Sequence, residues 1–270
     1  MNPVEITENN GPVILSQPHG GTYLHLAADV PAELSGKLNE RGRSFADTDW
    51  HINRLYDGLL PEATVVEAKF SRYLIDANRD PSGTSLYPGQ NTTELCPTVD
   101  FDGQPIYQNG TEPSPEEVET RRKSYHVVYH AALSEQIERV RKKHEVVLLF
   151  DCHSIRSEIP FLFEGQLPDF NLGTNNGSTC DTKIEETAVS VCAKATGYSH
   201  VINGRFKGGW TTRYYGNPAK GIHTIQLELA QRTYMDEFAP WLYHEERSAN
   251  LRIHLKKLLS CLEQLISTFT

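Results

Sequence analysis

The segment EVVLLFDCHS, residues 145–154, joins an uninterrupted apolar run to a polar end. The run from Val146 to Phe150 offers apolar side chains to both faces of a strand, which is typical of a strand inside a parallel sheet. Asp151 and His153 would then stand at the carboxyl end of that strand. Functional groups gather at that edge of open α/β sheets, so the segment predicts a fold class and the place of a site.

Strand and helix patterns alternate on both sides of this segment. Strands are expected at 12–16, 63–70, 71–77, 200–204 and 223–229, helices at 47–59, about 114–143, 181–196 and 239–268, and a long surface loop at 80–113. Ser114, Pro115 and Glu117 form a capping box at the start of the longest helix. The alternation predicts an α/β protein with three layers, α/β/α, around a central mixed, largely parallel sheet. We expect one catalytic domain over residues 1–270.

Composition and charge limit the classes of protein to which this chain can belong. Hydrophobic residues make up 38% and charged residues 23% of the sequence, as in a globular protein with a full core. The net charge of −9, from 26 basic and 35 acidic residues, argues against nucleic-acid and anionic-membrane binding. No apolar run is long enough to span a membrane, and the N-terminus lacks the pattern of a secretory signal. Five dispersed cysteines without a CxxC pair fit a reducing compartment, so we expect a cytoplasmic protein of undetermined oligomeric state.

Two histidines at the ends of expected strands are candidates for metal ligands. His19 follows the strand at 12–16 and His153 follows the central strand, so both would reach the same edge of the sheet. A hydrolytic zinc site holds its ion with three protein ligands and keeps one position open. The segment DTDWH offers three candidates for the third ligand, Asp47, Asp49 and His51. Of these we prefer Asp49.

Acidic and thiol side chains near the histidines are further candidates. Glu228 breaks the apolar alternation of the strand at 223–229, and a carboxylate there would accept a proton from a water at the metal. The alternative is an exposed acid on an edge strand. Asp151 would orient His153. We interpret Cys152 as a small buried thiol rather than a nucleophile.

Arginines near the expected strand ends predict recognition of an anion. Asn78 and Arg79 follow the strand at 71–77, and the fork of an arginine binds carboxylates in a bidentate manner. Arg213 lies in a glycine- and aromatic-rich loop and is a candidate for a second carboxylate. Arg72 is a candidate for polarising a substrate carbonyl. Taken singly, each arginine also fits a solvated surface position.

Seven motifs follow one another along nearly the whole chain. They are SQPHGGTYL (16–24), DTDWHINRLYD (47–57), FSRYLIDANRDP (70–81), LLFDCHS (148–154), LPDFNLGTNNGSTC (167–180), FKGGWTTRYYG (206–216) and GIHTIQLELAQRTYMDE (221–237). Together they resemble the N-formylglutamate amidohydrolase family, which is related to zinc carboxypeptidases and aspartoacylase-type deacylases. The resemblance implies a zinc-carboxypeptidase-like fold and the hydrolysis of N-formyl-L-glutamate to formate and L-glutamate in histidine degradation. A zinc-dependent deacylase of another small N-acyl amino acid is the alternative.

The resemblance also implies roles for individual residues. The related enzymes bind zinc through a His-x-x-Glu motif and a later histidine, hold the substrate carboxylate with an Asn-Arg pair and use a late glutamate as general base. The positions that match these groups are His19 and His153, Asn78 and Arg79, and Glu228. The residue three positions after His19 is Thr22, so Asp49 is expected to supply the missing carboxylate. The implied cofactor is Zn²⁺ or another divalent transition metal, and the implied substrate is a small anionic N-acyl amino acid.

Overall fold

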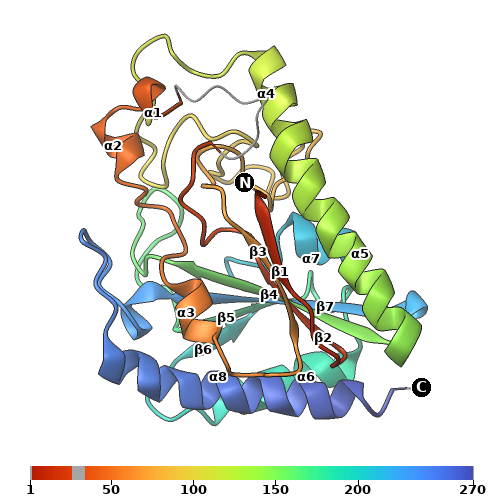
Figure 1. Ribbon diagram of the computed structural model, residues 1–270. Coiled ribbons are helices and arrows are strands. Elements are labelled where there is room, and N and C mark those ends of the chain that lie inside the picture. The colour runs from red at the N-terminus through yellow and green to blue at the C-terminus, as the bar shows by residue number, and fades with distance from the viewer. Residues whose placement is uncertain (1, 26–33, 270) are drawn as a thin grey trace.

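A seven-stranded sheet runs through the computed structural model, which describes residues 2–25 and 34–269 (Figure 1). Its strands are β1 (Val4–Thr7), β2 (Val13–Gln17), β3 (Thr64–Ala68), β4 (Val147–Ile155), β5 (Phe170–Gly173), β6 (His200–Ile202) and β7 (Ile222–Ala230). Their order in the sheet is β1-β3-β2-β4-β7-β5-β6. The pairs β1–β3 and β5–β7 are antiparallel and the other four are parallel. The predicted mixed, largely parallel sheet is therefore confirmed.

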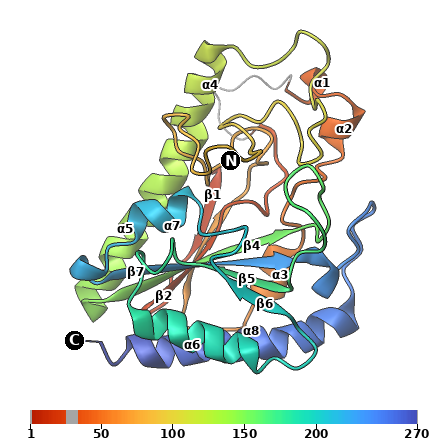
Figure 2. The ribbon, with the colours of Figure 1, turned by 180° about the vertical axis from the view of Figure 1, so that it is seen from behind.

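Helices cover both faces of this sheet (Figures 1 and 2). They are α1 (Leu34–Lys37), α2 (Glu40–Arg43), α3 (Ile52–Tyr56), α4 (Pro115–Arg121), the π-helical η1 (Arg122–His126), α5 (Val127–His144), α6 (Thr182–Ala193), α7 (Trp210–Tyr215), the short 3-10 helices η2 (Pro218–Lys220) and η3 (Gln231–Thr233), and α8 (Glu245–Ile266). The continuous rod of α4, η1 and α5 lies on one face, and α6 and α8 pack together on the other. The predicted three-layer α/β arrangement is confirmed. Within the described ranges, no helix has the length and apolar character needed to cross a membrane.

The central strand β4 is buried along its whole length, as its apolar run predicts. Leu148 and Phe150 belong to the core on the side of α6 and α8, whereas Val147 and Leu149 belong to the core on the side of α5. Each such side chain contributes roughly 1.5–3 kcal/mol when it is removed from water. Burial on both faces therefore fixes β4 in the middle of the molecule.

The long helix begins as its sequence predicts, although only half of the capping box forms. The Ser114 hydroxyl accepts the backbone N–H of Glu117 at 3.3 Å, and Pro115 occupies the first helical position. The Glu117 carboxylate pairs instead with Lys37 and Arg121. The pair with Lys37 links the helix to α1, while the cap still satisfies one of the free N–H groups of the first turn.

The helix expected at 47–59 is wrong in its first half, because only α3 is helical. Asp47 and Asp49 are buried in a turn that precedes α3. Their carboxylates accept the backbone N–H groups of Phe101 and Ser154, respectively. Acidic side chains that bind distant backbone in this way favour a turn over a first helical turn.

The strand expected at 71–77 is also wrong, since this segment has no regular structure. It is fully buried, which explains its strand-like composition of β-branched and aromatic residues. Its backbone bonds are those of turns and loop contacts: the Leu74 N–H donates to the Ser71 carbonyl, and the Asp76 N–H donates to the Leu95 carbonyl. Apolar content alone predicted burial correctly but not the backbone conformation.

Replacing Gly21 by alanine should destabilise the fold near His19. A β-carbon on Gly21 would overlap the backbone of Lys69, where the chain leaving β2 passes the end of β3. We expect a loss of about 1–3 kcal/mol or more of unfolding free energy, measured by urea denaturation. Gly36→Ala in α1 is the matched control, because no described atom lies within 4 Å of its added carbon. Equal stability of the two variants would contradict the close approach.

Candidate active site

The pairing of β4 with β7 places the central functional side chains. The two strands are parallel, and His153 is the direct partner of Glu228. Asp151 and Gln226 share the face of this pair, because side chains two residues apart in a strand point the same way. Cys152 points into the opposite core, where burial raises the pKa of its thiol well above the ordinary value. Its predicted role as a small buried thiol agrees with this position.

Both candidate histidines have one ring nitrogen engaged by a buried carboxylate. His19 Nε2 lies 2.7 Å from Asp76 Oδ1, and His153 Nε2 lies 3.0 Å from Asp151 Oδ2. A carboxylate only accepts hydrogen bonds, so each Nε2 carries a proton and the Nδ1 atoms are left as metal-binding positions. These two Nδ1 atoms are 3.1 Å apart.

Asp49 completes a cluster of three ligand atoms. Its Oδ2 lies 3.3 Å from His153 Nδ1 and 3.8 Å from His19 Nδ1, while the Ser154 N–H donates to the same oxygen at 3.0 Å. The ligand atoms of His19, Asp49 and His153 all lie within 4.8 Å of one another. Tetrahedral bonds of roughly 2.0–2.2 Å separate ligand atoms by about 3.3–3.6 Å. The cluster therefore fits a single small cation with little movement.

The other two candidates from the same segment point elsewhere. Asp47 Oδ2 accepts the Phe101 N–H at 2.8 Å, and burial raises the pKa of Asp47 to about 6. His51 Nε2 lies 2.7 Å from the backbone carbonyl of Trp241. Of the three, the fold brings Asp49 to the histidines.

The two histidines have opposite pKa shifts. Burial, assisted by the charge of Arg72, lowers the pKa of His19. Burial opposes a charge on His153 as well, but Asp151 and Asp49 outweigh it and raise the pKa of His153 well above the ordinary value. The two rings therefore lie in different electrostatic surroundings, although their Nδ1 atoms are only 3.1 Å apart.

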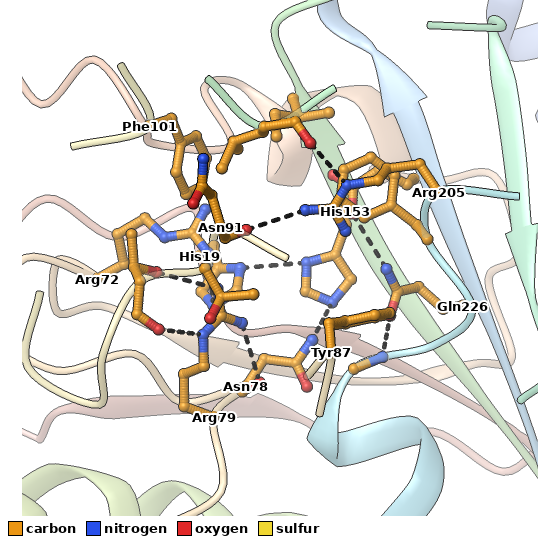
Figure 3. A pocket seen from close by; sticks show the side chains of 17 residues that line it. His19, Arg72, Asn78, Arg79, Tyr87, Asn91, Phe101, His153, Arg205 and Gln226 are labelled. Atoms are coloured by element: carbon orange, nitrogen blue, oxygen red, sulfur yellow. Dashed lines mark hydrogen bonds between the residues drawn. The ribbon is translucent and has the colours of Figure 1, made fainter. Parts of the chain in front are cut away.

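His19 and His153 line a cavity of about 570 Å³, its open mouth included (Figure 3). The charged side chains that line it, besides the two histidines, are Arg72, Arg79, Arg205 and Glu228. One wall comes from the long loop at 80–113, which contributes Tyr87, Asn91, Thr92, Thr93 and Phe101.

Glu228 faces the cavity beside the cluster. Its Oε2 accepts a hydrogen bond from Gln226 Nε2 at 3.0 Å. Burial, together with the negative charge of Asp49, raises the pKa of Glu228 to about 8. A carboxyl group in this environment can take up and release a proton near neutral pH.

Arg72 reaches the cavity from the irregular segment after β3. Its Nη1 donates to the Asp47 carbonyl and its Nη2 donates to Asp76 Oδ2, each at 3.0 Å. Its guanidinium lies 4.6 Å from the centre of the Phe101 ring. The buried Nε has no hydrogen-bond partner among the described residues. Arg72 is thus a fixed positive charge beside the candidate metal ligands.

Asn78 and Arg79 line the same cavity as the two histidines, although the strand expected before them is absent. Asn78 Nδ2 is 3.1 Å from His153 Nε2, and Asn78 Oδ1 accepts the N–H of Thr211 at 2.8 Å. Arg79 donates from Nε and Nη2 to the carbonyl and hydroxyl of Thr93, both at 3.0 Å. The side chain of Arg79 lines the cavity in this fixed orientation.

The remaining arginine of the sequence prediction does not line the cavity. Arg213 donates to the carbonyls of Gly208 and Leu86 and lies outside the lining. Arg205, which the sequence reasoning missed, lines the cavity instead. Asp76 was missed too, although an acid directly after an apolar run was a usable signal. No comparable signal marked Arg205.

Comparisons with known proteins show the family. A family model described as N-formylglutamate amidohydrolase matches residues 11–235. The chain belongs to the N-formylglutamate amidohydrolase family. Two curated relatives are each named N-formylglutamate deformylase: one from Pseudomonas putida is 48% identical, and one from Pseudomonas aeruginosa is 46% identical, each over 93% of this chain and 92% of the relative. The family predicted from the motifs is confirmed.

A solved structure supports the same fold. The crystal structure of N-formylglutamate amidohydrolase from Ralstonia eutropha JMP134 matches with a TM-score of 0.79 and 23% sequence identity. The match covers 98% of this chain and 99% of that chain. Members of the N-formylglutamate amidohydrolase family with diverged sequences therefore share this arrangement of sheet and helices.

Two buried histidines of the long helical rod hold the backbone on either side of Asn78. His130 Nε2 lies 2.8 Å from the Ala77 carbonyl, and His126 Nε2 lies 3.1 Å from the Arg79 carbonyl. A carbonyl only accepts, so each Nε2 carries the proton of a neutral ring. Burial lowers the pKa of both rings, that of His130 to about 3. These neutral histidines fix the carboxylate-binding candidates against the helix.

His130 should make the protein sensitive to acid. Its folded-state pKa of about 3 lies below the unfolded value of 6.5, so the unfolded chain takes up the proton first. This contribution is complete above pH 6.5 and is lost as the pH falls, by about 2 kcal/mol between pH 7 and pH 5. Urea unfolding of wild type and His130→Gln at both pH values measures the difference in slope. Equal pH dependence of the two proteins would contradict the assignment.

Proposed function

We propose that this chain is a metal-dependent amidohydrolase that hydrolyses N-formyl-L-glutamate to formate and L-glutamate. The observation that carries the proposal is the convergence of His19, Asp49 and His153 on one point beside Glu228, in a cavity lined by arginines. Family membership and the two deformylase relatives support the same reaction. The candidate site draws on residues from 19 to 228, which supports one catalytic unit over residues 1–270.

We propose Zn²⁺ as the ion, bound by His19 Nδ1, His153 Nδ1 and Asp49 Oδ2. Two imidazoles and one carboxylate form a donor set typical of catalytic zinc, and other divalent transition metals suit it as well. The ion supplies Lewis-acid polarisation of a carbonyl and lowers the pKa of a water toward 7. Asp76 and Asp151 hold the histidine rings in the orientation that this binding requires.

Glu228 acts as the proton carrier of the proposed reaction. It accepts a proton from the water that attacks the formyl carbon, and it returns this proton to the amine nitrogen as the C–N bond breaks. A cation at the cluster lowers the pKa of Glu228 from about 8, because positive charge favours the carboxylate. The group is then ionised, and so ready to accept a proton, near neutral pH.

Arginines bind the substrate and the charge that develops on it. Arg72, with its buried free Nε, stabilises negative charge on the formyl oxygen. Asn78 and Arg79 hold the α-carboxylate, which is one carbon away from the nitrogen of the scissile bond. The closeness of Asn78 to His153 supports this assignment.

The cell compartment and the pathway are part of the proposal. All five cysteines are free and four of them are buried, which supports a reducing cytoplasm. The reaction would serve histidine degradation. A small N-acyl amino acid is the only partner that the site requires, and the acidic net charge supports neither nucleic acid nor an anionic membrane as a partner.

Removing the charge of Asp49 should weaken metal binding much more than removing the charge of Asp47. Asp49 is the proposed ligand, whereas Asp47 lies in the same turn and binds the Phe101 N–H. Mutating a residue that only hydrogen-bonds a metal ligand typically lowers metal affinity by roughly 10–100-fold. We expect Asp49→Asn to lower zinc affinity by more than this. Asp47→Asn should change it little. Competition with a chromophoric chelator measures both affinities, and a reversed order would reassign the third ligand.

Glu228→Gln should retain zinc but lose formate release from N-formyl-L-glutamate. Glutamine keeps the shape of the side chain and cannot carry the proton, so kcat should fall by about 10²–10⁴-fold. Formate dehydrogenase coupling measures the rate, and elemental analysis measures the metal.

The wild-type protein provides the test of the function itself. It should prefer N-formyl-L-glutamate over N-formyl-L-alanine and N-acetyl-L-glutamate. Zinc-loaded wild type without formate release would refute the proposed function, and full activity of Glu228→Gln would remove this residue from the role of base.

A further inference from the structure

Arg205 is a charged residue of the cavity that has no role in the proposed hydrolysis so far. It lies in the loop between β6 and α7 and lines the same cavity as Arg79. In Figure 3, Arg205 and Arg79 lie on opposite sides of the pair formed by His19 and His153. The cavity therefore has a second cationic side, separate from the Asn78–Arg79 pair.

The hydrogen bonds of Arg205 fix its guanidinium without neutralising it. Nε donates to the Leu162 carbonyl at 3.0 Å, and Nη2 donates to the Asn91 carbonyl at 3.2 Å. Arg79 has the carboxylate of Asp76 at 3.7 Å, but no carboxylate of residues 2–25 or 34–269 forms an ion pair with Arg205. Two neutral acceptors hold the side chain in place and leave its charge for a ligand.

The surroundings of Arg205 favour an anion. Burial, together with the nearby charge of Arg79, lowers the pKa of Arg205, although Tyr87 and Glu228 oppose this shift. Leu162 and Phe206 form an apolar wall beside it. Charge pairs in such partly dry surroundings are stronger than in water. The methylene groups of a short acidic side chain would also pack against that wall.

Arg213 has local contacts like those of Arg205 but a different position relative to the cavity. Both Arg205 and Arg213 lie near the Tyr87 ring, at 5.4 and 4.9 Å from its centre, and both donate to backbone carbonyls. Only Arg205 lines the cavity. The two arginines thus have similar local contacts but differ in access to a bound substrate.

We propose that Arg205 binds the side-chain carboxylate of the substrate and sets the preference for an acidic amino acid. This inference rests on the proposed function, since it names the group that recognises the second carboxylate. The α-carboxylate lies closest to the scissile bond and belongs with Asn78 and Arg79, beside His153. The side-chain carboxylate is two carbons further away, so the opposite cationic side suits it.

The test compares two substrates of equal shape in zinc-loaded enzyme. N-formyl-L-glutamine replaces the side-chain carboxylate of N-formyl-L-glutamate by a neutral amide. Arg205→Ala should lower kcat/KM for N-formyl-L-glutamate by about 10- to 100-fold and leave the rate with N-formyl-L-glutamine nearly unchanged. Arg205→Lys should retain part of the preference, because it keeps the charge and loses the fork.

Arg213→Ala is the matched control, and its ratio of the two kcat/KM values should equal that of wild type. Zinc content and thermal melting of every variant show whether a loss reflects folding instead. If Arg205→Ala keeps the wild-type ratio, or if Arg213→Ala abolishes it, the inference fails while the proposed function stands. If wild type releases formate from neither substrate, the proposed function itself fails.

Discussion

The parallel pairing of β4 with β7 is the constraint on which the rest of the site depends. It sets His153 directly beside Glu228 and leaves Cys152 in the core on the other face. A shift of one residue would exchange the two faces of a strand. Such a shift would move Phe150 and Leu148 from the core beside α6 and α8 to the core beside α5, and it would turn His153 away from Glu228. Packing of the apolar core therefore favours this register, and the register keeps His153 beside Glu228.

The sheet supplies only half of the candidate site, and buried irregular segments supply the other half. Asp49 reaches the histidines from a turn, where its N–H donates to the His19 carbonyl and its carboxylate accepts the Ser154 N–H. Asp76 contacts His19 from the irregular segment 71–77, whose composition predicts a strand. A regular strand would alternate its side chains, whereas a turn can present neighbouring side chains to one point. The conformations that differ from the sequence prediction are thus those that complete the cluster.

Most of the strands and helices could be predicted from the sequence because periodicity and buried runs report them directly, whereas the short strands β1 and β5 had no expected counterpart. His19, His153 and Glu228 could be found for the same reason, since each interrupts or follows a strand pattern. The candidates for the third metal ligand could be narrowed only to Asp47, Asp49 and His51. Arg205 and Arg213 show the limit: each lies near glycine and aromatic residues in the sequence, yet tertiary contacts direct only Arg205 into the cavity.

The distribution of charge explains how a chain with a net charge of −9 can select a dianion. Asp151 contacts His153, and Asp76 contacts His19, Arg72 and Arg79, so these buried carboxylates are all matched by groups of the site. The cavity presents Arg79 and Arg205, held mainly by neutral carbonyls and hydroxyls. The field at short range depends on these oriented groups and not on the total charge of the molecule. A substrate with only an α-carboxylate would leave Arg205 without a counter-charge in a partly dry cavity, so the arrangement disfavours neutral side chains.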